Sequence, residues 1–192
     1  MRPETYIAMR THAITILRGY FEHVDVPCAV PGKKDHGDVD CLVAGFKGDK
    51  KHERYFEILR EAFNTRYAYS VGEEERCCMF FAVPSPEEGS SEGDKRAYIQ
   101  IDVQVCRNAK MFDWERQRLG YASLPSMILG SVGHPLGLTK NPDGLFLRVP
   151  GLDKVDCNGS LILLTQDWIQ LLKFFGVDID MYGKFQSEDE SE

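Results

Sequence analysis

The 192-residue sequence lacks any apolar run long enough to cross a membrane. Its longest apolar stretches, such as SLILL (160–164) and MILG (127–130), are far shorter than the roughly 20 residues that a membrane-spanning helix needs. The N-terminal stretch (1–21) is interrupted by charges and lacks the apolar block and small-residue cleavage site of a secretory signal. We therefore expect an intracellular protein, cytoplasmic or nuclear, with no membrane partner.

The sequence also lacks a C-x-x-C pair and any Cys/His spacing suited to zinc. Cys77 and Cys157 are expected to be half exposed. The remaining cysteines lie among apolar residues of expected strands, where a thiol acts as a small hydrophobe: Cys28, Cys41, Cys78 and Cys106. This usage predicts free thiols, and it excludes a disulfide framework and a zinc knuckle.

Positive charge is scarce as well, since the formal net charge is −7. This balance excludes a protein that coats a long stretch of nucleic acid by neutralising phosphates, but it allows a small phosphorylated substrate. Two acidic segments, 84–95 and the tail 184–192, have compositions that do not support packing. We expect a mobile loop and a disordered end there, and the acidic tail leaves open a partner domain or chain.

Hydrophobic residues make up 43% of the chain, which is enough to fill a core. Their spacing predicts helices at 3–23, 50–66, 109–118, 123–132 and 165–176, the last with Thr165 as N-cap and Gly176 as terminator. Strands are expected at 26–30, 38–43, 68–71, 77–83 and 97–105, followed by a hairpin that turns at 141–144 and an Asn-Gly turn in DCNGSLILL.

This element order predicts an α/β (α+β) fold with a mixed sheet and helices packed on one side. We expect a core over residues 1–106 and a C-terminal helical and hairpin lobe over 107–183, followed by the disordered acidic tail at 184–192. The first two strands are expected to form a hairpin joined by the loop PGKKDHG.

Two aspartates at the head of an apolar strand are the main chemical signal. Asp38 and Asp40 project to the same side of the strand because side chains alternate, whereas Val39 and Cys41 point into the core. Asp102 lies on the polar side of another alternating strand, AYIQIDVQV, and completes a trio. Three carboxylates on neighbouring strands predict a hard-oxygen site for Mg²⁺ or Mn²⁺.

The loop before this strand contains what a triphosphate would need. Gly32 allows a close backbone approach, and Lys33 and Lys34 supply point charges. Two ions about 3.5–4 Å apart would activate an attacking hydroxyl and stabilise leaving pyrophosphate in an in-line displacement. The pattern therefore favours phosphoryl or nucleotidyl transfer.

The segments PGKKDHGDVDCLV and IQIDVQV together resemble the core of the DNA polymerase β-like nucleotidyltransferase superfamily. The family pattern is a Gly-Ser or Gly-Gly turn, an apolar-flanked D-x-D and a third carboxylate on a later strand. The resemblance covers roughly residues 5 to 106. It implies that the positions of Asp38, Asp40 and Asp102 hold two divalent metals and that the glycine turn contacts the triphosphate, although Lys33 stands where the serine of the Gly-Ser pair would be.

These observations predict a metal-dependent, ATP-binding or otherwise NTP-binding nucleotidyltransferase that moves a nucleoside monophosphate to a hydroxyl acceptor and releases pyrophosphate. The acceptor is open between RNA, DNA, protein and a small molecule. One alternative is an inactive nucleotide-binding or protein-interaction module on the same fold. A second alternative is a D-x-D glycosyltransferase, which is disfavoured because the segment before Asp38 is short for a nucleotide-binding half.

Overall fold

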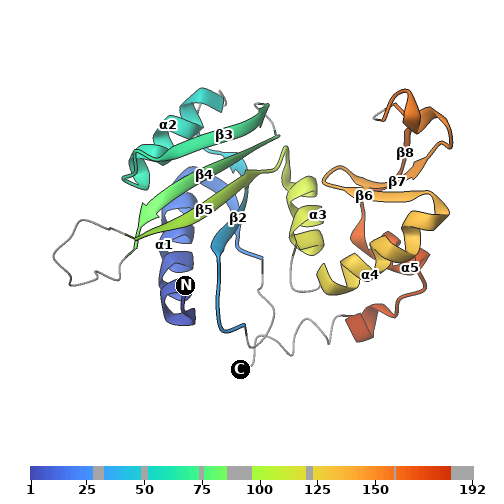
Figure 1. Ribbon diagram of the computed structural model, residues 1–192, viewed down its shortest axis with the longest axis horizontal. Helices are drawn as coiled ribbons and strands as arrows, with labels where there is room; N and C mark the ends of the chain where they lie inside the picture. Colours follow the sequence, from blue (N-terminus) through green and yellow to red (C-terminus); the bar gives the residue numbers. More distant parts are fainter. Residues whose placement is uncertain are drawn as a thin grey trace. The chain divides into compact units, whose positions relative to one another are not determined.

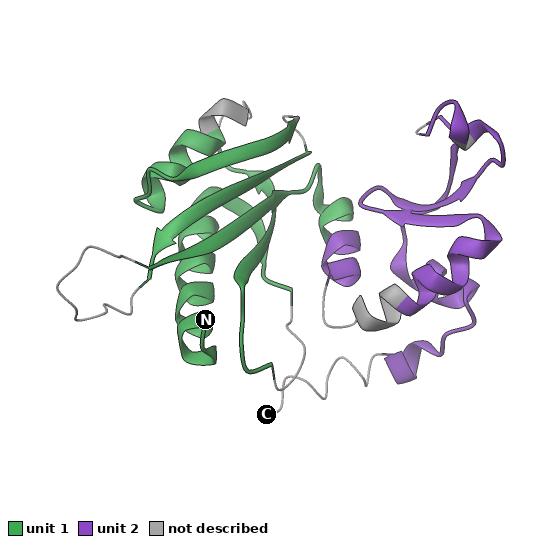
Figure 2. Cartoon of the chain, in the orientation of Figure 1, with its two compact units in different colours: residues 1–112 green, residues 113–192 purple. Residues whose placement is uncertain are grey.

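The computed structural model describes residues 1–27, 33–48, 52–73, 76–85, 97–119, 123–157 and 159–182. The chain divides into two compact units, residues 1–112 and 113–192 (Figure 2). The sequence-based boundary after residue 106 stays a prediction. The loop is predicted over 84–95, but Pro84 is the last residue of a strand, and residues 86–95 lie outside the described residues. The tail at 184–192, Asn158 and Gly32 lie outside them as well.

Unit 1 contains a five-stranded mixed sheet in the order β1-β2-β5-β4-β3 (Figure 1). Strand β2 pairs with β5 in parallel, and the other neighbouring strands are antiparallel. The elements of this unit, including the helix α3 that continues beyond residue 112, are α1 (Pro3–Tyr20), β1 (Phe21–Asp25), β2 (Asp38–Phe46), α2 (His52–Ala62), β3 (Ala68–Glu73), β4 (Arg76–Pro84), β5 (Tyr98–Val105) and α3 (Ala109–Leu119).

Both α1 and α2 cover the same face of this sheet (Figure 1). Buried side chains recur along α1 at every fourth residue, including Met9, Ala13 and Leu17, which lie on one stripe of a helix. They pack with Leu59 and Phe63 from the α2 region and with alternate residues of the strands. The core therefore lies between this face of the sheet and the two helices.

Unit 2 contains a three-stranded antiparallel sheet in the order β6-β7-β8. Trp114 and Trp168 are both buried in its core and contact each other edge-to-face, with ring centroids 5.4 Å apart. Its further elements are α4 (Ser123–Gly133), the 3₁₀ helix η1 (His134–Leu136), β6 (Leu138–Asn141), β7 (Gly144–Arg148), the 3₁₀ helix η2 (Leu152–Lys154), β8 (Leu161–Thr165) and α5 (Trp168–Phe174).

The mixed α/β architecture and several local predictions are confirmed. Asn141 and Gly144 are paired at the end of the β6-β7 hairpin, as the turn residues predict. Gly176 has a left-handed φ of 71° just beyond α5 and ends that helix. No helix in the described ranges has the length and apolar character needed to cross a membrane.

The predicted end of the first helix is wrong. Helix α1 ends at Tyr20, and the backbone at Phe21 is already extended. The strand that pairs with β2 is β1, whereas Val26 and Pro27 follow it without strand structure and residues 28–30 lie outside the described residues. Phe21 is 1% exposed, so burial of its ring in the sheet outweighs the helical spacing of the preceding segment.

Two further predictions of side-chain position are wrong. Cys77 is buried and Cys78 is half-buried on the opposite face, because Cys77 shares its parity with the core residues Met79 and Phe81. At α5 the N-cap is Asp167, whose carboxylate accepts hydrogen bonds from the backbone amides of two α5 residues. The residue predicted for this role, Thr165, is the last residue of β8.

Replacement of Gly72 by alanine tests the conformation of β3. Gly72 has a φ of +106°, and an added Cβ would lie 2.3 Å from the backbone oxygen of Arg76. We expect Gly72→Ala to destabilise unit 1 by on the order of 1–3 kcal/mol, measured by chemical denaturation followed by circular dichroism. Gly19→Ala is the matched control, because Gly19 is helical with open space around its Cβ position, and it should be neutral or stabilising. Equal stability of the two variants would contradict this conformation.

Candidate functional site

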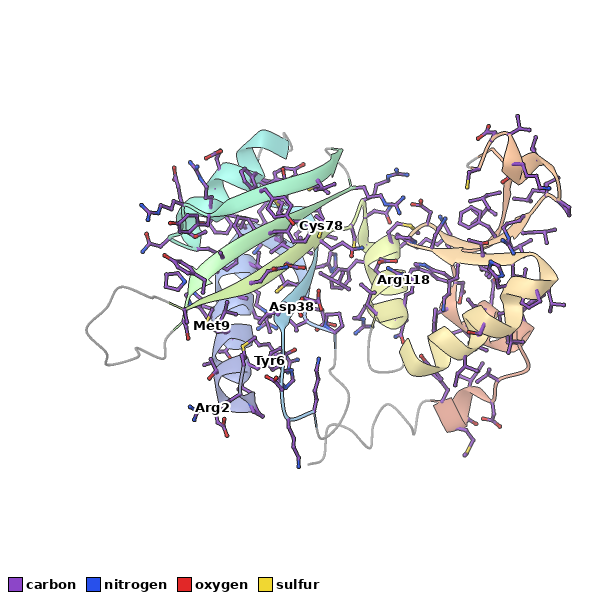
Figure 3. The ribbon with its side chains drawn as sticks, viewed as in Figure 1. Arg2, Tyr6, Met9, Asp38, Cys78 and Arg118 are labelled. Atoms are coloured by element: carbon purple, nitrogen blue, oxygen red, sulfur yellow. The ribbon has the colours of Figure 1, made fainter. Side chains whose placement is uncertain are left out.

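Three aspartates meet where β2 runs parallel to β5. Asp38 and Asp40 are exposed residues of β2 and alternate along the strand with buried Val39 and Cys41. The register places Asp40 directly opposite Asp102 of β5. One carboxylate oxygen from each of the three aspartates lies within 4.8 Å of the other two. The side chains predicted to form a site from their strand parity are therefore brought together. Figure 3 labels Asp38 on β2 and Cys78 on β4.

Gln100 is a site residue that the sequence reasoning did not include. It lies opposite Asp38 in the neighbouring strand, and its Nε2 donates a hydrogen bond of 2.8 Å to Oδ1 of Asp102. This bond restrains the Asp102 carboxylate. The signal was present in the sequence, because Gln100 precedes Asp102 by two residues in an alternating strand and so shares its face.

The crowding of carboxylates changes their protonation. Partial loss of hydration raises the pKa of Asp40, the Asp38 charge raises it further, and Lys33 lowers it. Loss of hydration likewise raises the pKa of Asp102; the hydrogen bond from Gln100 opposes this shift, and the charges of Asp40 and Asp38 add to it. The uncompensated negative charge therefore disfavours the fully ionised trio and favours a cation among the three groups.

The donor set fits a hard divalent ion. All three ligands are carboxylate oxygens, which are the ligands that Mg²⁺ and Mn²⁺ prefer. Oxygens on opposite sides of a Mg²⁺ ion lie about 4.2 Å apart, twice the metal–oxygen distance of about 2.1 Å. Three oxygens on one ion include at least two adjacent pairs, which lie about 3.0 Å apart at this metal–oxygen distance. The side chains of Asp38 and Asp40 are exposed and would close the present separations, all within 4.8 Å, around a bound ion. Asp38 and Asp40 are exposed, so a substrate oxygen could complete the coordination.

The loop that leads into β2 contains two exposed lysines, of which Lys33 lies near the trio. Lys33 lies close enough to lower the pKa of Asp40, and Lys34 is also exposed. His36 is buried, and its ring stacks on Tyr6 of α1 with centroids 3.9 Å apart. This stack attaches the loop to α1. Gly32 lies outside the described residues.

Cys78 faces the same side of the sheet as the trio, opposite Gln104 of β5. Burial raises the pKa of its thiol to about 11, with further contributions from the charges of Asp102 and Asp40. The thiol is therefore protonated at neutral pH and is a poor nucleophile. The chemistry of this face is that of its carboxylates.

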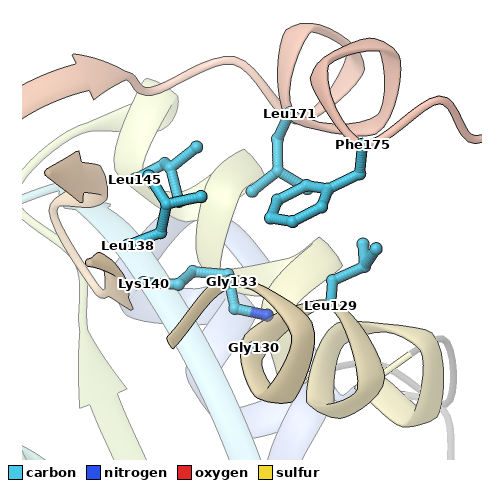
Figure 4. Close-up of a pocket in the computed structure, with 8 residues that line it drawn as sticks. All are labelled: Leu129, Gly130, Gly133, Leu138, Lys140, Leu145, Leu171 and Phe175. Atoms are coloured by element: carbon cyan, nitrogen blue, oxygen red, sulfur yellow. The ribbon is translucent and has the colours of Figure 1, made fainter. Parts of the chain in front are cut away.

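A separate cavity in unit 2 surrounds the side chain of Lys140 (Figure 4). Burial, together with the charge of Arg118, lowers the pKa of Lys140 to about 8, and its Nζ lies 5.5 Å from the centroid of the Trp168 ring. The cavity has an open volume of about 10 Å³. This volume holds about one water molecule, so the cavity is a packing gap and not a substrate site.

Comparison with known proteins adds no relative: no family model matches the chain, and no curated protein matches it.

The raised pKa values predict how stability depends on pH without metal. Between the ordinary aspartate pKa of 3.8 and the raised values, the folded protein binds more protons than the unfolded chain, so stability falls as the pH rises through this window. At neutral pH in chelator, Asp40→Asn should therefore melt a few degrees above the wild type by circular dichroism, and the difference should shrink as the pH approaches 3.8.

Addition of Mg²⁺ should reverse this order by raising the melting temperature of the wild type more than that of Asp40→Asn. Asp113→Asn is the matched control, because Asp113 is an exposed aspartate of α3 outside the trio. Identical pH profiles for wild type and Asp40→Asn, with no effect of Mg²⁺ on either, would count against a convergent carboxylate site.

Proposed function

We propose that this chain is a metal-dependent nucleotidyltransferase with a nucleotidyltransferase-like fold in unit 1. The observation that carries the proposal is the pairing of Asp40 with Asp102 across parallel strands, with Asp38 on the same face. Two carboxylates from one strand and a third from its neighbour form the arrangement expected from the resemblance to the DNA polymerase β-like superfamily. The mixed sheet with both helices on the opposite face supports the same fold.

In this proposal Asp38 and Asp40 would hold two Mg²⁺ or Mn²⁺ ions, and Asp102 would hold one of them. Bound ions would supply charge stabilisation for the attacking hydroxyl oxygen and the leaving phosphates. The acceptor oxygen forms a bond to the α-phosphorus of an NTP, and the bond from that phosphorus to the bridging oxygen of pyrophosphate breaks. The hydroxyl proton passes to the carboxylate of Asp102, which Gln100 orients.

The loop before β2 would bind the phosphates. Lys33 and Lys34 are exposed in this loop and would act as point charges, while Gly32 would allow a close backbone approach. These contacts are made to the triphosphate before and during transfer, so their loss should weaken binding more than it slows the reaction at saturation.

Replacement of the carboxylates and of the lysines should have different effects on kinetics. Asp40→Asn and Asp102→Asn should lower kcat by several orders of magnitude, because each removes a charge that is needed at the reacting centre. Lys33→Ala should mainly raise KM for the NTP. The measurement is pyrophosphate release from each of the four NTPs with Mg²⁺ or Mn²⁺, in the presence of RNA, DNA, protein and small hydroxyl acceptors.

The controls separate this proposal from its rivals. Asp113→Asn should retain wild-type kinetics. A wild type that binds NTP but turns over none of the four with any metal or acceptor would favour the inactive nucleotide-binding module. Turnover of nucleotide sugars alone would favour the glycosyltransferase, and full activity of Asp40→Asn would exclude the two-metal proposal.

A further inference from the structure

Aromatic side chains lie on the same face of the sheet as the three aspartates. Tyr69 of β3 is paired with Phe80 of β4, and Phe80 is paired with Asp102 of β5. Directly paired residues project to the same face, so a single row crosses four strands and ends at Asp40 of β2. Phe80 is the nearer of the two aromatic residues and lies on β4, the strand next to the one that contains Asp102.

Tyr69 and Phe80 form a stacked pair, which we call the aromatic platform. Their ring centroids are 4.6 Å apart and the rings are inclined by 16°. Tyr69 is 60% exposed, although its ring would gain from removal of apolar surface from water. Tyr69 lies on the edge strand β3, so a flat π-system can extend the stack at its exposed ring.

A second pair of rings lies at the N-terminal ends of β3 and β5. Tyr67 and Tyr98 contact each other edge-to-face at 5.4 Å, and the Arg66 guanidinium carbon lies 4.9 Å from the Tyr67 ring centroid. Arg66 also donates a hydrogen bond of 2.9 Å to the Tyr67 hydroxyl, and a guanidinium has further N–H groups that can bind a phosphate. These three side chains line a broad hollow of about 730 Å³, together with Arg60, Glu61, Asn64, Thr65 and Pro84.

We propose that the aromatic platform binds the terminal nucleotide of a single-stranded nucleic acid, which is the acceptor of the transfer reaction. Its base extends the stack at the exposed Tyr69 ring, its terminal hydroxyl is directed along the row toward Asp102, and Arg66 contacts the backbone. This inference rests on the proposed function and adds the acceptor class to it. Aromatic rings combined with arginine on an open sheet are the features that bind single strands without a fixed sequence.

The geometry of the reaction assigns the platform to the acceptor and not to the incoming NTP. In an in-line displacement the attacking hydroxyl and the leaving pyrophosphate lie on opposite sides of the phosphorus. Lys33 and Lys34, the proposed phosphate contacts, precede the start of β2, whereas the platform lies across β5 on β4 and β3 (Figure 1). An acceptor on the platform therefore approaches from the side away from the pyrophosphate.

The net charge limits how much of a nucleic acid this face binds. With −7 overall and carboxylates in the same row, the surface suits a footprint of one or two nucleotides and not a long strand. Each phosphate neutralised on a single strand contributes about −0.7 to the slope of log affinity against log salt concentration. We expect a shallow slope that corresponds to one or two phosphates.

The test measures binding without NTP, by fluorescence anisotropy of a short single-stranded oligonucleotide labelled at the end remote from its free hydroxyl. RNA and DNA versions are compared, each with a normal and an abasic terminal nucleotide. Tyr69→Ala should weaken binding of the normal oligonucleotide by about 5-fold to 150-fold, the range for loss of one stacked base. The abasic oligonucleotide should bind the wild type more weakly by a similar factor, and it should be insensitive to Tyr69→Ala.

Two variants serve as controls. Tyr69→Phe keeps the ring and should retain binding. Phe174→Ala removes a 61% exposed aromatic ring from α5, outside the platform, and should also retain it. If Tyr69→Ala does not fold, the comparison of normal and abasic oligonucleotides on the wild type still tests the inference. Equal affinity for those two oligonucleotides, or a wild-type self-association that Tyr69→Ala abolishes in sedimentation, overturns it.

Oligonucleotide binding tests the aromatic platform, and NTP turnover tests the nucleotidyltransferase, so either proposal can fail without the other. Base-dependent binding with no NTP turnover supports the platform and contradicts the nucleotidyltransferase. Turnover with a protein or small-molecule acceptor, without base-dependent oligonucleotide binding, supports the enzyme and overturns the platform.

Discussion

The parallel pairing of β2 with β5 is the constraint on which the site depends. The register that seals the core through Val39, Cys41, Ile101 and Val103 also sets Asp40 against Asp102 on the other face. A shift by one residue would move the carboxylates to the apolar face, where burial of unpaired charges costs several kcal/mol. The hydrophobic effect therefore fixes the position of the charges, even though these charges repel each other.

The two faces of the unit 1 sheet have different roles, one in packing and the other in presenting side chains. Helices α1 and α2 cover one face and supply the packing that specifies strand order. The other face presents carboxylates over β2 and β5 and aromatic rings over β3 and β4. Because the stability of unit 1 comes mainly from the covered face, side chains of the open face can be selected for ligand contacts at little cost to the fold.

The part of the site that could be predicted from the sequence is the part that depends on strand parity. Asp38, Asp40 and Asp102 were assigned to polar faces from alternation alone, and their carboxylates meet. The aromatic platform could not be derived in this way, because it depends on which residue of β3 lies opposite Phe80, and single-strand patterns contain no register. The same holds for the stack of His36 on Tyr6, which joins residues far apart in the chain.

The wrong predictions of a helix end, a buried cysteine and an N-cap each have a local cause. The helical spacing of apolar residues continues to Phe21, yet the chain turns into β1 there because the ring is needed in the sheet. Cys77 and Cys78 are adjacent residues of the same type, and only their parity relative to Met79 distinguishes them. Cys77 lies two residues before buried Met79 and is buried with it. At α5 both Thr165 and Asp167 are good capping residues, and the end of β8 decides in favour of the second.

The tryptophans of the chain have a consequence for its spectroscopy. The sequence contains two, and both are buried in the core of unit 2. Transfer to water on unfolding should change their emission, so intrinsic tryptophan fluorescence reports the melting of the unit 2 core that surrounds them. The sheet with the aspartates has only tyrosine and phenylalanine as fluorophores, and loss of its structure leaves no direct tryptophan signal. Two transitions seen by circular dichroism, of which fluorescence detects one, would separate the unfolding of the two units.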